Sequence, residues 1–235
     1  PDECRWALTR PARAASLKQR ERRLRQTLAK DTCWPAGVWG DNLWTLAALY
    51  LNEKTDQANA RLLRDAKRYG EACRAGGKPA SPTPEEPGGA PWTFFSITDY
   101  VRTLCLFHAK SPHFPGRLKP ETEAAMKEAL WFWMSQGSRL DDYGADDLLL
   151  LLGTENHDLN SRPVHHLVTA LLADDPAYRD RTLADGHTAA EHAAAHAAFF
   201  REWPLRRAAS GLWVEIGSTT YQQYPWPALF NLHEL

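Results

Sequence analysis

Apolar side chains recur along this chain mostly at helical spacing, and the alternating pattern of a β-strand is nearly absent, so the chain is predicted to be all-α. The helices predicted in the first half are Ala15 to Lys30, Asn42 to Asn52, Asp56 to Ala75, Phe94 to Ala109 and Pro120 to Ser135. Those predicted in the second half are Ala145 to Leu152, Val164 to Ala173, Thr188 to Ala209 and Pro225 to Leu235. The segment from Gly211 to Thr220 suits an extended conformation.

The segment from Gly76 to Pro91 holds five Pro and four Gly residues, which predicts a loop. Successive helices with polar and aromatic residues in their connections suit an α/α toroid, in which helical hairpins circle a central cleft; a plain bundle is the alternative. We expect a single domain over residues 1–235. Because the last predicted helix lacks an antiparallel partner, we expect an incomplete toroid, either the first part of a larger catalytic domain or one that closes by association, as in a homodimer.

The composition is that of a globular protein with a large core, with 43% hydrophobic and 24% charged residues among 235. A formal charge of −1 supplies no global field to attract nucleic acid or an anionic membrane, although it leaves local basic patches open. There is no apolar run long enough to span a membrane. The four cysteines form no C-x-x-C pair, which gives no support to a zinc ribbon or a redox motif. The chain opens at Pro1 without an initiator Met or a signal peptide, as a processed or trimmed product would.

Polar residues are concentrated in the run Gly153-Thr154-Glu155-Asn156-His157-Asp158, directly after the apolar run Leu148 to Leu152. An amide, an imidazole and two carboxylates held together can neutralise a charge, move a proton or hold a metal. The structural alternative is the end of a helix finished by polar side chains, with Asp158 or Asn160 capping the next helix.

Glu155-Asn156-His157-Asp158, followed about sixty residues later by Ser218-Thr219-Thr220-Tyr221, resembles the toroidal polysaccharide lyases, a group that includes alginate and glucuronan lyases. The resemblance extends loosely over residues 31–235. It implies a secreted or periplasmic enzyme acting on an acidic polysaccharide, with Asn156 and His157 at the uronate carboxyl group and Tyr221 at the proton that is removed. These lyases commonly use a nearby Arg, and because none shortly precedes Tyr221, the substitutes in this chain are Arg207, Arg206 and Arg162.

The chemistry of β-elimination agrees with these residue types. Removing the C5 proton of a uronate creates a carbanion beside a carboxylate, so the site must first neutralise the carboxylate. Asn156 and His157 can donate hydrogen bonds to it, while Tyr221 takes the C5 proton and supplies one to the leaving C4 oxygen. With an unperturbed pKa of about 10, the tyrosine needs a nearby cation or donor. No metal or other cofactor is required.

The remaining candidates each have a structural alternative. Trp39 and Trp44 could stack a sugar ring or pack in the core, and Glu215 could hold Tyr221, contact sugar hydroxyls or pair with Arg206 or Arg207. His192 and His196, near His187 and Glu191, have a spacing that can bind a metal, but without the H-E-x-x-H order of a metalloprotease they are more simply surface or core histidines. The resemblance gives His192 another role, near the substrate cleft.

Two other functions are compatible with the same residues. A glycoside hydrolase on the same toroid would use two carboxylates from the set Asp41, Glu155, Asp158 and Glu215 as acid and base. From a different class of protein, the chain could be a non-catalytic carbohydrate-binding or assembly module. The sequence favours a lyase over both.

Overall fold

The structure is a computed structural model, and it describes residues 10–29, 41–74, 97–151, 154–211, 218 and 225–235. The helices are α1 (Arg10–Ala29), α2 (Asp41–Leu51), α3 (Thr55–Arg74), α4 (Ile97–Phe107), α5 (Pro120–Gly137), α6 (Glu155–Ala173), α7 (Ala189–Ala209) and α8 (Pro225–Glu234). Two short 3₁₀ turns, η1 (Leu140–Tyr143) and η2 (Ala145–Asp147), precede α6. The only β pairing within these ranges is an isolated bridge between Thr182 and Thr188, so the all-α prediction is confirmed.

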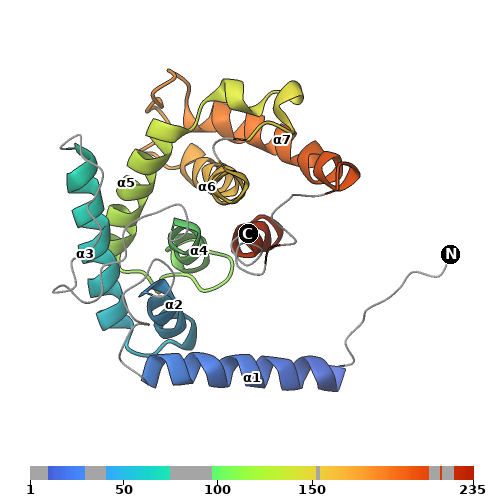
Figure 1. Ribbon diagram of the computed structural model, residues 1–235. Helices are drawn as coiled ribbons and strands as arrows, with labels where there is room; N and C mark the ends of the chain where they lie inside the picture. Colours follow the sequence, from blue (N-terminus) through green and yellow to red (C-terminus); the bar gives the residue numbers. More distant parts are fainter. Residues whose placement is uncertain (1–9, 30–40, 75–96, 152–153, 212–217, 219–224) are drawn as a thin grey trace.

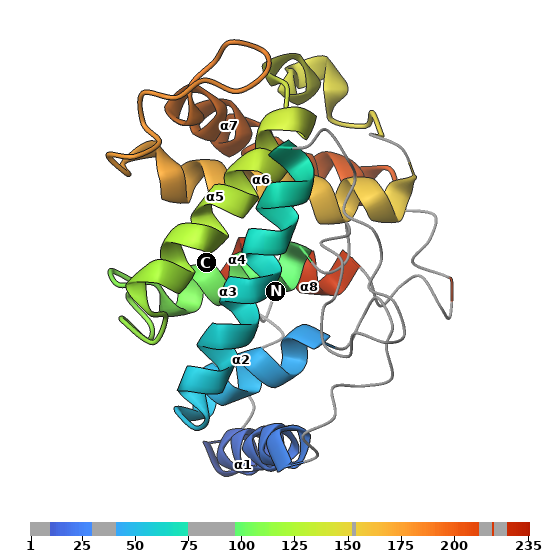
Figure 2. The same cartoon turned by 90° about the vertical axis from the view of Figure 1, so that its left-hand side faces the viewer.

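The helices form two layers. Figure 1 shows α2, α4, α6 and α8 roughly end-on, with α1, α3, α5 and α7 surrounding them on three sides. Each helix of the inner layer packs against the next one along the chain, and α3 packs along α5 in the outer layer. Figure 2, seen from the side, shows α3 and α5 in front of the inner helices.

Contacts between particular residues give the directions of the helices. Lys127, in the first half of α5, bonds to Asp175 just after α6 at 2.9 Å. Trp133, late in α5, packs its ring at a tilt against His165 in the middle of α6, so α5 and α6 are antiparallel. Asn59, near the start of α3, accepts from the backbone of Lys119 at the start of α5 at 2.7 Å, so these outer helices are parallel.

The inner helices all run in one direction. Asn231 of α8 donates to the Thr98 carbonyl oxygen at 2.9 Å, and Arg102, one turn further along α4, pairs with Glu234, one turn further along α8. Helices α4 and α8 are therefore parallel. Helices α2 and α4 each form a hairpin with the outer helix that follows them, and these outer helices, α3 and α5, are parallel, so α2 and α4 run in the same direction. Because α6 is antiparallel to α5, it runs in that direction too. The first residues of all four inner helices thus lie toward one end of the inner layer.

The main core lies between the two layers and forms because the inner helices carry apolar residues on several faces. In α4, the buried positions include Ile97, Tyr100, Val101, Leu104 and Phe107, at helical spacing. Each such side chain contributes about 1.5 to 3 kcal/mol when it is removed from water. By contrast α1 is polar all round and, among its side chains from residue 15 onward, buries only Leu28.

Three predicted helices differ from the structure, the first being α1, which begins at Arg10, five residues before its predicted start at Ala15. The helix predicted at Ala145 to Leu152 is wrong, because only the short η2 forms there and Leu149 to Leu151 are exposed. The helix predicted from Val164 begins nine residues earlier, at Glu155, and contains Pro163 in its interior. The predicted loop 76–91 and most of the segment predicted to be extended, 211–220, lie outside the described residues. None of the described helices combines the length and apolar character needed to cross a lipid bilayer.

Candidate functional site

The polar run that stands out in the sequence forms the first turn of α6. Thr154 is the extended N-cap residue, with φ −85° and ψ 161°. Asn156 is buried, His157 is half-buried, and the Thr154 hydroxyl donates to Asn156 Oδ1 at 3.4 Å, which orients the amide. The run therefore begins a helix instead of finishing one, and the exposed backbone N–H groups of a helix start carry a partial positive charge.

Four charged side chains lie together beneath this turn. Asp158 and Arg162 are both completely buried and form an ion pair at 2.7 Å. Arg207, near the end of α7, lies 3.6 Å from the second oxygen of Asp158 and 3.8 Å from Glu155. Two carboxylates and two guanidinium groups balance in charge, which is the condition under which buried ions are tolerated. We call Glu155, Asp158, Arg162 and Arg207 the buried ion cluster.

Arg162 also holds the chain that leads into α6. Its Nε donates to Asp158, one terminal nitrogen to the Asp142 carbonyl oxygen in η1, and the other to the Leu150 carbonyl oxygen at 3.3 Å. The guanidinium lies between the rings of Tyr143 and Phe199, 4.9 and 4.8 Å from their centroids. All of its donor nitrogens are thus used within the protein.

The sequence-based prediction that Arg162 and Arg207 bind substrate does not fit these positions. The exposed fraction is 0% for Arg162 and 5% for Arg207, so neither guanidinium faces solvent. Their partners lie within the protein, one turn away in α6 for Arg162 and on the neighbouring helix for Arg207. Both arginines form ion pairs with carboxylates in the first turns of α6, and these pairs stabilise that end of the helix.

Trp44 has no exposed surface on which a sugar ring could stack. It is 0% exposed in the main core, and the Arg61 guanidinium lies 3.9 Å from its ring centroid. Its position therefore fits core packing instead of substrate binding. Trp39, Glu215 and Tyr221 lie outside the described residues, so their assigned roles stay predictions.

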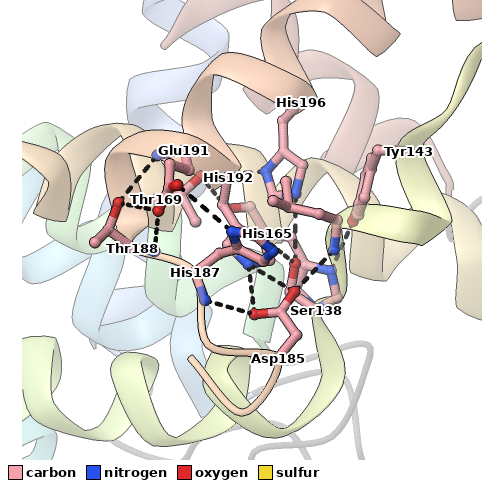
Figure 3. A network of polar contacts seen from close by, with 11 residues as sticks. Ser138, Tyr143, His165, Thr169, Asp185, His187, Thr188, Glu191, His192 and His196 are labelled. Atoms are coloured by element: carbon pink, nitrogen blue, oxygen red, sulfur yellow. Dashed lines mark hydrogen bonds and ion pairs between the residues drawn. The ribbon is translucent and has the colours of Figure 1, made fainter. Parts of the chain in front are cut away.

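A second polar cluster joins α5, α6 and α7 (Figure 3). Ser138, just after α5, lies 3.1 Å from His192 Nδ1 and 3.4 Å from His196 Nε2. His192 Nε2 contacts Asp185 at 3.1 Å. Tyr143 contacts His165 at 2.8 Å and Thr169 contacts His196 at 3.2 Å. We call Ser138, Tyr143, His165, Thr169, Asp185, His192 and His196 the histidine cluster.

The histidine cluster contains a Ser–His–Asp arrangement, but its burial excludes a nucleophile open to substrate. Ser138 is 1% exposed, and both His192 and His196 are 0% exposed. Burial lowers the pKa of His165 to about 3, with Arg162 and His192 adding to the effect, and burial likewise lowers the pKa of His196. These rings are neutral at pH 7, and their hydrogen bonds satisfy them as polar core residues.

The metal alternative for these histidines has no support in the described ranges. No group of three His, Cys, Asp or Glu side chains there is arranged to hold an ion. Glu191 instead closes a capping box with Thr188 at the start of α7. Asp185 and Ser138, which sequence reasoning missed, are the partners of His192, and no spacing rule would have joined Ser138, 54 residues away, to this histidine.

The structure does not bring His192 together with Asn156 and His157. His192 lies 15 residues before Arg207 on α7, a distance of about 22 Å along the helix axis. Since Arg207 is the residue that approaches the first turn of α6, His192 lies toward the opposite end of that helix pair. Its predicted place near the cleft is therefore not supported.

Asp99, in the first turn of α4, is a titratable residue that the sequence analysis did not single out. Burial raises the pKa of its carboxyl group to about 7, against the opposing field of Arg102. Because α4 and α6 are parallel neighbours, Asp99 lies toward the same end of the inner layer as Asn156 and His157. A carboxyl group that titrates near neutrality can act as an acid or a base.

Comparisons with protein-family models, with curated proteins and with solved structures found no match to this chain. The resemblance to toroidal lyases therefore rests on the residues quoted above. The structure adds to it the place of Asn156 and His157 in the fold and the charged groups beneath them.

Proposed function

We propose that this chain is a polysaccharide lyase that cleaves a uronate-containing polymer by β-elimination. The observation that carries the proposal is the position of Asn156 and His157. They lie in the first turn of an inner helix, above a charge-balanced buried ion cluster, at the end where the inner helices begin. Action on an extracellular polymer would place the protein outside the cytoplasm, secreted or periplasmic.

The two-layer arrangement supports an incomplete α/α toroid as the fold. A toroid of helical hairpins requires parallel inner helices, with an outer helix after each one that brings the chain back to the end where the next inner helix begins. In such a fold the segments that enter the inner helices all reach the same end. Trp39 stands two residues before α2 in sequence and Tyr221 four residues before α8, so a toroid would collect them near Asn156 and His157.

The electrostatics of the α6 start suit an anionic ligand. The partial positive charge of a helix N-terminus favours a carboxylate. The buried ion cluster adds no net charge, so its two carboxylates do not oppose an incoming uronate. The half-buried His157 imidazole is a donor of the kind that can hold the uronate carboxyl group and stabilise the charge that develops on it, while the Asn156 amide, only 4% exposed, lies buried in the same turn.

The proposed reaction is a balanced elimination. Tyr221 removes the C5 proton, the electron pair of the C5–H bond forms the C4–C5 double bond, and the C4–O bond breaks with its electrons going to the leaving oxygen. A proton returned from Tyr221 completes the new hydroxyl group. No water is consumed, and one product carries an unsaturated uronate at its new non-reducing end.

The test is a panel of uronate polymers followed by the ultraviolet absorbance of the unsaturated product. We expect one polymer to give a steady increase with the wild-type protein. Tyr221→Phe should lower the rate by about 100-fold to 10,000-fold, because general acid–base catalysis contributes factors of this size, while binding of the same polymer stays nearly unchanged. Tyr221→Phe with near-normal turnover would remove the mechanism.

A glycoside hydrolase is the second candidate, favoured by the position of Asp99 in the first turn of the inner helix α4, where burial raises the pKa of its carboxyl group to about 7. Glu155 and Asp158, two of the carboxylates considered from sequence, are buried beside arginines and are poorly placed for this work. A hydrolase would release reducing ends without the unsaturated absorbance. Binding of the polymer with no turnover at all would favour a non-catalytic module.

A further inference from the structure

The helix α1 concentrates positive charge that the rest of the chain lacks. Between Arg10 and Arg25 the sequence has seven basic residues and one acidic residue, Glu21, whereas the whole chain has a formal charge of −1. Lys18, Arg20, Arg22, Arg23 and Arg25 are all exposed. A helix of 20 residues is about 30 Å long. The positive surface is therefore both dense and extended.

Most of this charge is not used within the protein. Arg25 pairs with Glu21 and Glu53. In the ranges that the structure covers, Lys18, Arg20, Arg22 and Arg23 make no ion pair. Four neighbouring cations without acidic partners repel one another, which disfavours the helix. An anion bound along α1 would remove that repulsion.

α1 is attached to the body mainly near its C-terminal end. Leu28 is 3% exposed, and the Leu28 carbonyl oxygen accepts from Lys54 at 3.3 Å. Leu17, three turns earlier, is 53% exposed. The basic stretch therefore contributes little apolar packing to the core, and its side chains are available to a partner in solution.

A groove of about 690 Å³ runs beside this helix, between α1 and the inner helices α2, α4 and α8. Its lining is mainly leucine and also includes Arg20, Arg102, His113 and His233, while its two carboxylates, Glu21 and Glu234, are paired with Arg25 and Arg102. Tyr50, 43% exposed, lies in the same groove with its ring edge-on to Phe114. An exposed aromatic ring in the same groove as the Arg20 guanidinium suits a ligand that offers both apolar faces and negative charge.

We propose that the exposed face of α1, together with this groove, is an accessory site that holds an acidic polysaccharide chain. The choice of a uronate polymer rests on the proposed function, because that substrate is the polyanion this protein would meet. Both ribbon views place α2 and α4 between α1 and α6. The accessory site therefore anchors a long chain and takes no part in the elimination.

The experiment compares binding by two variants with equal loss of charge. In the first, Lys18, Arg20, Arg22 and Arg23 are replaced by Gln. In the control, four exposed basic residues on other elements, Lys67, Lys110, Arg139 and Arg201, are replaced by Gln. Both sets are made in the Tyr221→Phe background, so that fluorescence anisotropy of labelled alginate or glucuronan reports binding without turnover.

We expect the α1 variant to bind the long polymer roughly tenfold more weakly at low salt, since four weak exposed ion pairs together give about one factor of ten. The control should bind like its parent. Added salt should weaken the parent more than the α1 variant. Turnover of short oligosaccharides, measured with Tyr221 restored, should be unchanged in the α1 variant.

Three results would overturn the accessory site. They are equal binding by the α1 variant and its parent, equal loss of binding in the control, and tighter α1-dependent binding of duplex DNA than of the uronate polymer, which would assign the surface to nucleic acid. The proposed function is judged separately. If binding depends on α1 but no unsaturated product forms, the lyase proposal fails and the accessory site stands.

Discussion

The same two antiparallel helices, α6 and α7, build two polar clusters that differ in charge and in access. The buried ion cluster joins the start of α6 to the end of α7, and half-buried His157 lies in the turn above it. The histidine cluster lies toward the other end of this helix pair, holds His165 and His196 as neutral rings, and encloses a Ser–His–Asp arrangement that no substrate can reach. Similar residue types thus support different roles, and contact with solvent together with local charge distinguishes the two.

The largest stability effect is expected in the buried ion cluster. Arg162→Leu leaves Asp158 buried without its closest partner, and breaking such a pair costs about 3 to 5 kcal/mol of unfolding free energy. Urea denaturation measures this loss. The matched control is Arg179→Leu, whose ion pair with Asp180 has side chains 59% and 87% exposed and should contribute less than about 0.5 kcal/mol. Equal effects from both variants would show that Arg162 is not held as described.

Acid should destabilise the protein through the histidine cluster. The pKa of His165 is lowered to about 3 in the folded protein, while an unfolded histidine has a pKa of about 6.5. Between these values the unfolded chain binds a proton that the folded protein does not, so stability falls as pH falls below about 6.5. The cost is at most about 1.4 kcal/mol per pH unit for each such histidine.

The groups around His165 and His196 act in the same direction. Arg162, His166 and His192 all oppose a further positive charge there. Hydrogen bonds from Leu140, His192 and His187 lower the pKa of Asp185 despite burial, so its stabilising contribution also declines in acid. Urea midpoints from pH 7 to pH 4 should fall for the wild type and fall less for His165→Phe. A midpoint independent of pH in this range would contradict the buried neutral state.

A smaller effect is expected from Ser138→Ala, which removes the hydroxyl group shared by His192 and His196. Leaving buried ring nitrogens with fewer partners should cost about 1 to 2 kcal/mol. Turnover by the folded variant should stay at the wild-type level, because the cluster has no contact with substrate. A loss of turnover at temperatures where the variant is fully folded would assign Ser138 to the chemistry instead.

The helix α3 could be predicted to within a few residues because its apolar residues recur at helical spacing, whereas α5 and α7 carry clear start signals, Pro120 in α5 and the capping box of Thr188 and Glu191 in α7. The first two turns of α6 could not be predicted. Glu155, Asp158 and Arg162 look like surface residues in the sequence, and they are buried only because they neutralise one another and Arg207. Hydrophobic periodicity cannot detect a helix face buried through ion pairing.

The candidate site divides in the same way. The adjacent Asn156 and His157 could be chosen from the sequence because an amide and an imidazole side by side suggest carboxylate binding. The burial of Arg207 could not, since its partners stand about fifty residues earlier and on another helix. The burial of Trp44 could not be predicted either, because nothing in the residues around it distinguishes a tryptophan that stacks on a sugar ring from one that packs in the core.

The most direct test of the central claim compares His157→Ala with His165→Phe in the formation of unsaturated product from the uronate polymer that the wild type cleaves. Both proteins are first confirmed to be folded at pH 7. We expect His157→Ala to lose both rate and affinity for the polymer, and His165→Phe to keep the wild-type rate. Wild-type turnover by His157→Ala would show that the start of α6 is not where the elimination takes place.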